Sequence, residues 1–300
     1  MGPTATGKTA LAVETAKAIN GEVISVDSAL IYQDMNIGTA KPSEEEKQGI
    51  PHYLIDIISP QEQYSVADFV HDTNQCITDI LGRKRVPILT GGTMMYFNAL
   101  HHGISNIPEA DKSVRQKIQI QIEHLGLSKM HERLQAVDPQ SAAKIHPNDP
   151  QRITRALEVF ESTAKPLSYW QAQKTDALPF DFVNFSIVPQ NRSELHLRIE
   201  KRFEQMLEQG LLAEVKHLLN KYCLDADTPS MRSVGYRQVL QYFNDELSFE
   251  QMKERSVIAT RQLAKRQLTW LNAWSDAHVL YMNNPSNLEE ILQKVCVSTP

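Results

Sequence analysis

Short apolar runs alternate with helical stretches along the first hundred residues. Runs rich in β-branched residues predict parallel strands over Glu22–Val26, Tyr53–Ile57 and Val86–Leu89. Helices are predicted over Ala10–Ala18, from the capping box at Ser65–Asp68 to about Leu81, and from Thr93 over Met94–Leu100. This alternation predicts an α/β fold in which a doubly wound parallel sheet is flanked by helices.

The pattern changes after Ile107-Pro108, where the chain becomes polar and helical without strand signals to about Asp176. Helices are predicted over Val114–Leu125, Ser128–Val137 and Pro150–Phe160, the last with an aspartate cap and proline at its first position. A strand over Phe182–Val188 then returns to the sheet. We therefore expect a core of residues 1–108 and 178–300 and an inserted all-helical domain of residues 109–177.

The last third of the chain is mainly helical. Leu195, Ile199, Phe203 and Met206 form one apolar stripe on a helix predicted over Ser193–Gln209. Further elements are predicted as helices over Leu211–Leu219 and Met252–Trp270, an edge strand over Val279–Tyr281 and a C-terminal helix. The core fold should therefore close with helices around the sheet.

The first residues carry the sharpest chemical signal. Gly2-Pro3-Thr4-Ala5-Thr6-Gly7-Lys8-Thr9 fits the phosphate-loop (P-loop) pattern G-x-x-x-x-G-K-[ST] at every fixed position. The glycines let backbone amides converge on an anion, Lys8 adds a mobile charge, and the Thr9 hydroxyl suits Mg²⁺. The helix that follows presents its positive end to the same anion. The fold is therefore expected to be P-loop NTPase-like, with a site for a diphosphate or triphosphate.

A P-loop normally follows a buried strand, and only Met1 precedes this one. A missing central strand would leave backbone groups on its neighbours unpaired, so we expect the intact protein to begin upstream of Met1.

Net charge, cysteine content and the length of apolar runs argue against three classes of protein: highly basic nucleic-acid-binding proteins, zinc- or disulfide-stabilised folds, and proteins with membrane-spanning helices. The net charge of −5 argues against an overall nucleic-acid coat but permits a local basic groove. The three cysteines are too far apart for a CxxC zinc site and too few for a disulfide framework, which suits the cytoplasm. No apolar run approaches the roughly 18 residues that span a membrane.

Two strand ends are candidate reaction sites. Asp27-Ser28 follows the first predicted strand, and carboxyl ends of parallel strands face the ligand crevice. A turn or helix-cap role for Asp27 fits the sequence equally well. Thr90-Gly91-Gly92-Thr93 follows the third predicted strand, where paired glycines permit close substrate approach.

Basic residues gather at three separated places. Arg152 and Arg155 lie in the first turns of their helix, where cations oppose the helix dipole, and this favours an anionic partner. Arg232–Arg237 combines two arginines with Tyr236, which could stack on a base or simply be packed. Met252–Trp270 holds five lysines or arginines against one glutamate, either as a solvated face or as a nucleic-acid contact.

Three classes of function fit these residues. A small-molecule kinase or nucleotide hydrolase would need an acid after an apolar strand; Asp27 could serve, but the third strand ends in Thr-Gly-Gly. A group transferase with a nucleic-acid acceptor explains the three basic clusters. A regulator or RNA-binding module without chemistry would show no multiple turnover with a donor diphosphate.

Seven motifs resemble those of the isopentenyl-tRNA transferase family, the bacterial tRNA dimethylallyltransferases, along nearly the whole chain. The matching segments, in order, are Gly2–Thr9, Ser25–Tyr32, Met35–Pro42, Gly91–Phe97, His146–Val159, Ser233–Gln238 and Thr260–Trp270. Apart from the P-loop each is weak alone, but their shared order makes the resemblance specific.

The resemblance implies a reaction. A dimethylallyl group would pass from dimethylallyl diphosphate to the exocyclic amine of the adenine 3′ to the anticodon, releasing pyrophosphate. The P-loop would hold the departing pyrophosphate, although such proteins are often described as nucleotide- or ATP-binding. The helical insertion would clamp the tRNA anticodon stem-loop. A cytoplasmic monomer requiring Mg²⁺ and no membrane is expected.

The resemblance also implies roles for individual residues. Asp27 matches the general base, Thr93 a catalytic position, and Arg202 a partner of the diphosphate beside residues 2–9. The implied tRNA contacts are Asp27, Ser28, Ala29, Leu30, Thr93, Arg115, Gln151, Arg152, Ile153, Thr154, Arg155, Arg232, Ser233, Val234, Gly235, Tyr236, Arg237, Lys265, Arg266, Gln267, Leu268, Thr269, Trp270, Leu271 and Asn272. Asn272 stands where the family commonly has arginine, so one phosphate contact is expected to be missing.

Overall fold

The chain folds into two compact units in the computed structural model, which describes residues 1–105, 107, 111–173, 175 and 177–297. The first unit comprises residues 1–98 and 179–300, and the second comprises residues 99–178. Helix α4 (Met94–His102) runs through the first boundary, so the second unit begins earlier than the change in sequence pattern suggests. The predicted boundary at Pro108 and the predicted helical limit at Asp176 lie outside the described residues.

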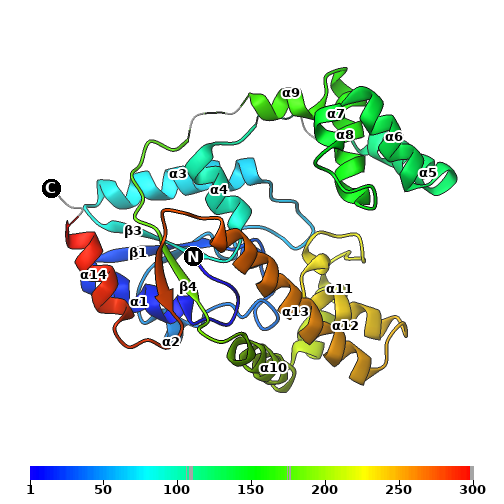
Figure 1. The fold of residues 1–300 in the computed structure, drawn as a ribbon. Helices are drawn as coiled ribbons and strands as arrows, with labels where there is room; N and C mark the ends of the chain where they lie inside the picture. The colour runs from blue at the N-terminus through cyan, green and yellow to red at the C-terminus, as the bar shows by residue number, and fades with distance from the viewer. Residues whose placement is uncertain (106, 108–110, 174, 176, 298–300) are drawn as a thin grey trace. The chain divides into compact units, whose positions relative to one another are not determined.

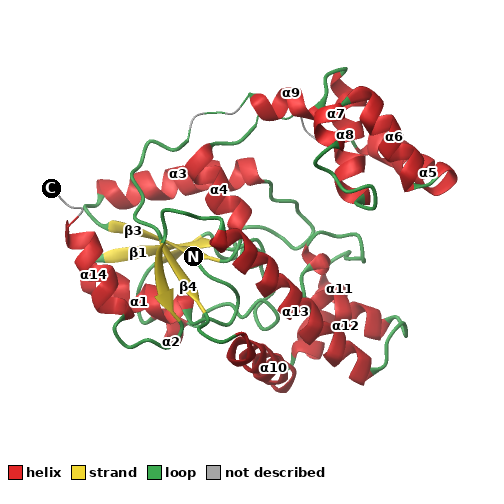
Figure 2. Cartoon of the chain, in the orientation of Figure 1, coloured by secondary structure: helices red, strands yellow, loops and turns green. Residues whose placement is uncertain are grey.

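A three-stranded parallel sheet forms the centre of the first unit (Figures 1 and 2). Strand β1 (Gly21–Val26) lies between β2 (His52–Tyr53) and β3 (Val86–Gly91). The register pairs Val26 with Gly91, so β1 and β3 end side by side. This brings the segments after both strands to one edge of the sheet, as predicted.

Helices cover both faces of this sheet. Every residue of β1 is buried. Helix α1 (Lys8–Ile19) packs Ala12 and Ala16 against Val23 on one face, and α3 (Val66–Gly82) lies on the other (Figure 1). The capping box predicted at the start of α3 is present. The predicted doubly wound arrangement is therefore confirmed.

Strand β2 is shorter than the predicted run Tyr53–Ile57. Leu54 and Asp56 adopt positive φ angles of 59° and 57°, which remove them from the extended conformation. The apolar pattern alone does not reveal this turn.

A second, two-stranded parallel sheet pairs β4 (Phe185–Val188) with β5 (His278–Tyr281). The expectation that the segment 182–188 pairs into the central sheet is wrong for the described residues, because β4 bonds to β5 and to Met1 instead. The Met1 amine donates to the Phe185 carbonyl at 2.7 Å, and the Ile187 amide donates to the Met1 carbonyl at 2.9 Å. The P-loop therefore starts from a backbone anchored to β4, and the expected strand before it stays a prediction.

Helices complete the first unit around a core that includes Met35, Phe203, Leu211 and Tyr236. The predicted stripe is confirmed, since Leu195, Ile199 and Phe203 are buried and Met206 is partly buried. The helices around this core are α10 (Arg192–Glu208), α11 (Leu211–Lys221), α12 (Tyr236–Phe243) and α13 (Phe249–Asn272), with a 3₁₀ turn over Ser230–Arg232. The unit also contains α2 (Glu44–Lys47) and α14 (Asn287–Val297), which packs Ile291 into a second cluster with Ile187 and Leu280.

The second unit is helical where it is described. Its elements are α5 (Lys112–Leu125), α6 (Leu127–Val137), α7 (Pro139–Ala142), α8 (Pro150–Thr163) and α9 (Leu167–Ala172). Ile118, Leu134, Ile153 and Leu157 form its core. The short helices α7 and α9 were not predicted. Asp138 ties them together by accepting from Ser141 N at 3.0 Å and Ser168 N at 2.9 Å.

None of the helices in the described part of the chain is both long and apolar enough to cross a membrane.

Glu22 provides a pH-dependent contribution to the stability of the sheet. Its side chain is 4% exposed and accepts hydrogen bonds from Tyr53 and Arg83, both at 2.7 Å, with Arg85 at 3.2 Å. Burial raises the pKa of Glu22, but these partners outweigh burial and hold the pKa below its ordinary 4.5. Because the folded-state pKa is depressed, the stabilisation is present above about pH 4.5 and is lost as the pH falls below it.

Glu22→Gln is expected to lower the free energy of unfolding at pH 7 by about 1.5 kcal/mol, since a charged acceptor is lost. Urea denaturation at pH 7 and pH 4 should show this difference shrinking in acid. Glu14→Gln, on the exposed face of α1, serves as the control. A difference that stays constant between the two pH values would contradict the role of the ionised carboxylate.

Candidate active site

A cavity of about 850 Å³ lies at the carboxyl edge of the central sheet. Its walls come from the P-loop, the ends of β1 and β3, the loop 36–43, helix α10, the turn Ser233–Gly235 and helix α13. Segments far apart in the sequence thus meet at the carboxyl ends of β1 and β3, where the sequence predicted a ligand crevice. The lining includes, of the predicted site residues, Thr4, Ala5, Thr6, Gly7, Lys8, Thr9, Asp27, Ala29, Leu30, Arg202, Ser233, Val234, Gly235 and Gln267.

The P-loop is shaped to receive an anion. Ala5 and Gly7 have positive φ angles of 64° and 84°, so the chain curls tightly before α1. A Cβ at Gly2 would lie 2.8 Å from the Ile187 carbonyl oxygen, which excludes a larger residue without a shift. Pro3 is buried and accepts from Thr6 Oγ1 at 2.8 Å. No side chain caps the first turn of α1, so its amides remain available to a ligand.

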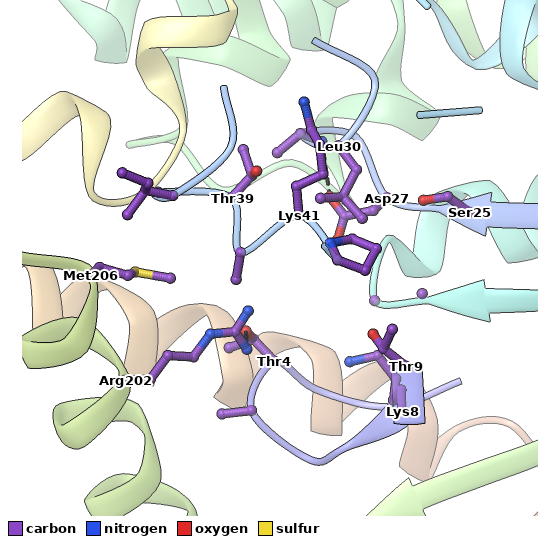
Figure 3. A pocket seen from close by; sticks show the side chains of 18 of the residues that line it. Thr4, Lys8, Thr9, Ser25, Asp27, Leu30, Thr39, Lys41, Arg202 and Met206 are labelled. Carbon is purple, nitrogen blue, oxygen red and sulfur yellow. Dashed lines mark hydrogen bonds between the residues drawn. The ribbon is translucent and has the colours of Figure 1, made fainter. Parts of the chain in front are cut away.

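Two cations meet the loop from different elements. Lys8 Nζ donates to the Pro3 carbonyl at 2.6 Å, and Arg202 reaches from α10 to Thr4 Oγ1 at 3.5 Å (Figure 3). Burial is the main cause that lowers the pKa of Lys8 to about 8; the attraction of Asp27 opposes this lowering, and the repulsion of Arg202 adds to it. Burial also lowers the pKa of Arg202, against the attraction of Asp27 and Glu46. Lys8 and Arg202 thus bring two positive charges into one cavity, where Asp27 is a single opposing charge for both. This arrangement suits an anion that carries more than one negative charge.

Asp27 and Thr93 occupy adjoining strand ends. Asp27 Oδ1 accepts from Ala29 N at 2.9 Å, which fixes the carboxylate at the start of the turn after β1. Thr93 Oγ1 accepts from Ser28 N at 3.0 Å and lies 3.3 Å from Ser28 Oγ. A Cβ at Gly91 would lie 1.9 Å from the Val26 carbonyl oxygen, so this close approach requires glycine. The paired glycines thus bring Thr93 to the segment that carries Asp27.

The wall formed by residues 36–41 was expected only as a loop, and its anchor was not predicted. Glu214, on α11, accepts from three successive amides of Asn36, Ile37 and Gly38 at 2.9, 2.7 and 3.1 Å. Tyr236 Oη donates to the same carboxylate at 2.6 Å. The loop then places Thr39 and Lys41 at the cavity. An isolated glutamate in a helical stretch gives no local signal of such a contact.

Lys41 is held by the neighbouring turn. Its side chain is 7% exposed, donates to the Tyr32 carbonyl at 2.9 Å and pairs with Asp56. It lines the cavity as a third basic residue beside Lys8 and Arg202. The sequence pattern did not single it out.

Tyr236 answers the question left open by the sequence. Its side chain is fully buried in the core, and its hydroxyl donates a hydrogen bond to Glu214. Tyr236 is therefore a packed core residue in this structure, and its ring is not accessible for stacking on a base. Its neighbours differ: Arg237 is exposed, and Arg232 pairs at 3.1 Å with the exposed Asp227. Both arginines therefore offer cations at the surface of this segment.

Helix α13 divides the residues 265–272 between surface and interior. The exposed side chains are Lys265, Arg266, Thr269, Trp270 and Asn272; Leu268 is half-buried, and Gln267 and Leu271 are buried. The basic cluster is therefore accessible, whereas Gln267 faces the cavity.

The second unit presents a similar division at α8. Gln151 and Arg152 are exposed, and Ile153 and Thr154 are buried in the core of that unit. Arg152 lies 3.5 Å from its cap Asp149, and Arg155 lies 3.3 Å from Glu158. Arg115 is exposed on α5. The buried pair thus fixes the helix that carries the exposed side chains.

Comparison with known proteins identifies a consistent group of relatives. The family model described as IPP transferase matches residues 30–274. The tRNA dimethylallyltransferases of two Coxiella burnetii strains, CbuG_Q212 and Dugway 5J108-111, are each 52% identical to this chain over 278 residues. These alignments cover 92% of this chain and 92% and 89% of theirs.

Solved structures of similar proteins share the fold. The tRNA isopentenylpyrophosphate transferase of Bacillus halodurans is 36% identical with a TM-score of 0.72, covering 99% of this chain and 94% of that one. The corresponding transferase of Staphylococcus epidermidis is 37% identical with a TM-score of 0.71, covering 100% and 98%. A eukaryotic dimethylallyltransferase acting on tRNA is 28% identical with a TM-score of 0.77, covering 99% and 76%.

Proposed function

The chain belongs to the IPP transferase family, and from that premise we propose that it is a tRNA dimethylallyltransferase. It transfers a dimethylallyl group from dimethylallyl diphosphate to the N6 amine of the adenosine 3′-adjacent to the anticodon and releases pyrophosphate. The observation that carries this proposal is the cavity that joins a P-loop, two cations and the Asp27 carboxylate.

The donor's diphosphate fits the P-loop side of the cavity. The amides at the start of α1, Lys8 and Arg202 would contact its oxygens, and these contacts strengthen as the C–O bond breaks and negative charge builds on the pyrophosphate. A departing diphosphate, rather than a nucleotide, is therefore the ligand we assign to this loop.

Asp27 is proposed as the general base on the acceptor side. The adenine amine is a poor nucleophile because its lone pair is delocalised into the ring. As the N6–C bond forms, the nitrogen must lose a proton, and the Asp27 carboxylate lies at the cavity wall to accept it. The adenine must leave its stack to reach this wall, and exclusion of water prevents hydrolysis of the allyl donor.

Mg²⁺ is proposed at Thr9, which is exposed at the start of α1 and lines the cavity. No cluster of three or more His, Cys, Asp or Glu ligands occurs among the described residues. A hydroxyl combined with phosphate oxygens and waters is a donor set that Mg²⁺ accepts. When bound, the ion would neutralise charge on the diphosphate.

Thr9→Ala is expected to raise the Mg²⁺ concentration for half-maximal pyrophosphate binding by about tenfold, the size typical of losing one contributor to a metal site. Calorimetric titration of pyrophosphate at several Mg²⁺ concentrations measures this directly. Thr9→Ser keeps the hydroxyl and should behave like the wild type. If Thr9→Ala leaves the metal dependence unaltered, Thr9 does not bind the ion.

The tRNA interface is proposed to use the exposed residues of the basic clusters. In the first unit these are Arg232, Arg237, Lys265 and Arg266, and in the second unit Arg115, Gln151 and Arg152. The buried members of the same segments are then supports for these side chains. We further propose a monomer that acts in the cytoplasm, where tRNA is found and where free thiols such as those of Cys76 and Cys223 stay reduced.

Arg237→Ala and Arg232→Ala are each expected to weaken tRNA binding and to reduce the slope of log K against log salt by about one, since each removes one phosphate contact. Filter binding of tRNA at several salt concentrations measures the slope. Arg192→Ala, exposed at the start of α10, is the control. An unchanged slope for both variants would remove these arginines from the interface.

The reaction itself is tested by incubating the protein with total tRNA and dimethylallyl diphosphate labelled in the allyl group. Nuclease digestion and mass spectrometry should place the label on the adenosine 3′ to the anticodon. Label elsewhere in the tRNA, or free labelled alcohol alone, would contradict the proposed function.

A further inference from the structure

Gln267 faces the cavity from helix α13, on the same side of the helix as Thr260 and Leu263. Its side chain is 9% exposed, and both ends of its amide have partners inside the protein. A buried amide with every group satisfied typically specifies one arrangement of its neighbours.

The two partners belong to opposite sides of the site. Gln267 Oε1 accepts from Thr4 N of the P-loop at 3.0 Å, and Nε2 donates to the Gly92 carbonyl at 2.8 Å. Thr4 Oγ1 is also the partner of Arg202, so this bond reaches the donor side. Gly92 precedes Thr93, whose hydroxyl accepts from Ser28 next to Asp27, so the other bond reaches the acceptor side.

Packing reinforces these bonds. A Cβ at Gly92 would lie 2.4 Å from Gln267 Nε2, so glycine is the residue that lets the amide lie against the turn. The same Cβ would lie 3.3 Å from the Gly2 carbonyl oxygen, so the P-loop also packs directly against this turn. Gln267 adds the side-chain hydrogen bonds that join the two segments.

We propose that Gln267 is a positioning residue that aligns the donor diphosphate with Asp27 and Thr93. The inference rests on the proposed function. It assigns Gln267 a role different from its exposed neighbours Lys265 and Arg266, which are available to RNA. In the dimethylallyl transfer, the electrophilic carbon and the amine must meet at a fixed distance, and a displacement near 1 Å can cost about 100-fold in rate.

The test compares Gln267→Met, which keeps the side-chain volume but removes both bonds, with Gln262→Met, an exposed glutamine on the same helix. Gln267→Met is expected to weaken binding of inorganic pyrophosphate by about tenfold, equivalent to about 1.4 kcal/mol. Its single-turnover rate at saturating donor and tRNA should fall by about 100-fold. Its affinity for tRNA, and all three properties of Gln262→Met, should match the wild type.

The inference is overturned if Gln267→Met loses tRNA affinity as Lys265→Ala does while its pyrophosphate affinity and saturated rate are retained. It is equally overturned if all three properties are unchanged. Should the wild type transfer no prenyl group, the proposed function fails, and the pyrophosphate comparison still tests whether Gln267 orders the loop.

Gly92→Ala gives a second test that keeps Gln267 itself. The added methyl group should displace the amide and lower pyrophosphate affinity as Gln267→Met does. Combining the two substitutions should cost little more than either alone, since both remove the same contact. Fully additive losses would show that the two residues act independently and would overturn the inference.

Discussion

Asp27→Asn is expected to lower the rate of prenyl transfer by about 10³-fold, within the range that positioned general bases contribute. The amide preserves size and can still accept the Ala29 amide hydrogen at Oδ1, so the turn after β1 should keep its shape. It cannot accept the proton that the adenine amine must lose. Because the substitution changes proton acceptance and not size, the dissociation constant for tRNA should change by less than about twofold, which is under about 0.5 kcal/mol of binding free energy.

Single-turnover measurements at saturating dimethylallyl diphosphate and tRNA separate these two quantities. Asp79→Asn, exposed on α3, is the matched control and should retain full activity. If Asp27→Asn abolished tRNA binding but transferred the prenyl group normally once bound, Asp27 would be a contact to RNA and the base would lie elsewhere.

The parts of the site that follow from local sequence are the ones built on backbone requirements. These parts are the P-loop glycines, the paired glycines at the end of β3, and the position of Asp27 after β1. Each arises from a short segment whose geometry is determined within a few residues. Parallel strands then bring these segments to one edge, so the fold pattern alone locates the cavity.

The contacts that close the cavity arise from tertiary packing and leave no local signal. Glu214 accepts hydrogen bonds from a loop that lies 176 to 178 residues earlier in the sequence. Gln267 accepts one from the P-loop, 263 residues earlier. In the sequence, both read as ordinary helix residues. Tyr236 illustrates the reverse case, since an aromatic beside two arginines suggested RNA but is buried in the core.

The pairing of β4 also depended on information beyond its own residues. An apolar β-branched run predicts a buried parallel strand but does not state which neighbour it bonds. Here β5 and the backbone of Met1 satisfy its hydrogen bonds. Strand partners separated by some ninety residues, as Phe185 and His278 are, require the complete fold to be known.

The second large effect is expected for Lys8→Met, which should have opposite consequences for catalysis and stability. Lys8 shares the cavity with Arg202, and burial is the main cause that lowers the pKa of Lys8 to about 8. The folded protein therefore holds the charged ammonium of Lys8 at a cost in folding free energy. Lowering this pKa from 10.5 to about 8 corresponds to about 3 kcal/mol, and loss of the hydrogen bond to the Pro3 carbonyl offsets about 1 kcal/mol of it. Removing the ammonium should therefore raise the free energy of unfolding by about 2 kcal/mol.

The same substitution should reduce kcat/KM for dimethylallyl diphosphate by about 10³-fold, because the departing pyrophosphate loses a donor aimed at its developing charge. Added pyrophosphate, which should raise the melting temperature of the wild type, should have little effect on that of Lys8→Met. Lys17→Met, exposed near the end of the same helix, should leave the donor dependence and the pyrophosphate response unchanged. A Lys8→Met protein that binds pyrophosphate as tightly as the wild type would place the donor's phosphates outside the P-loop. The charge complementarity on which the mechanism depends would then have to be assigned to Arg202 and Lys41 instead.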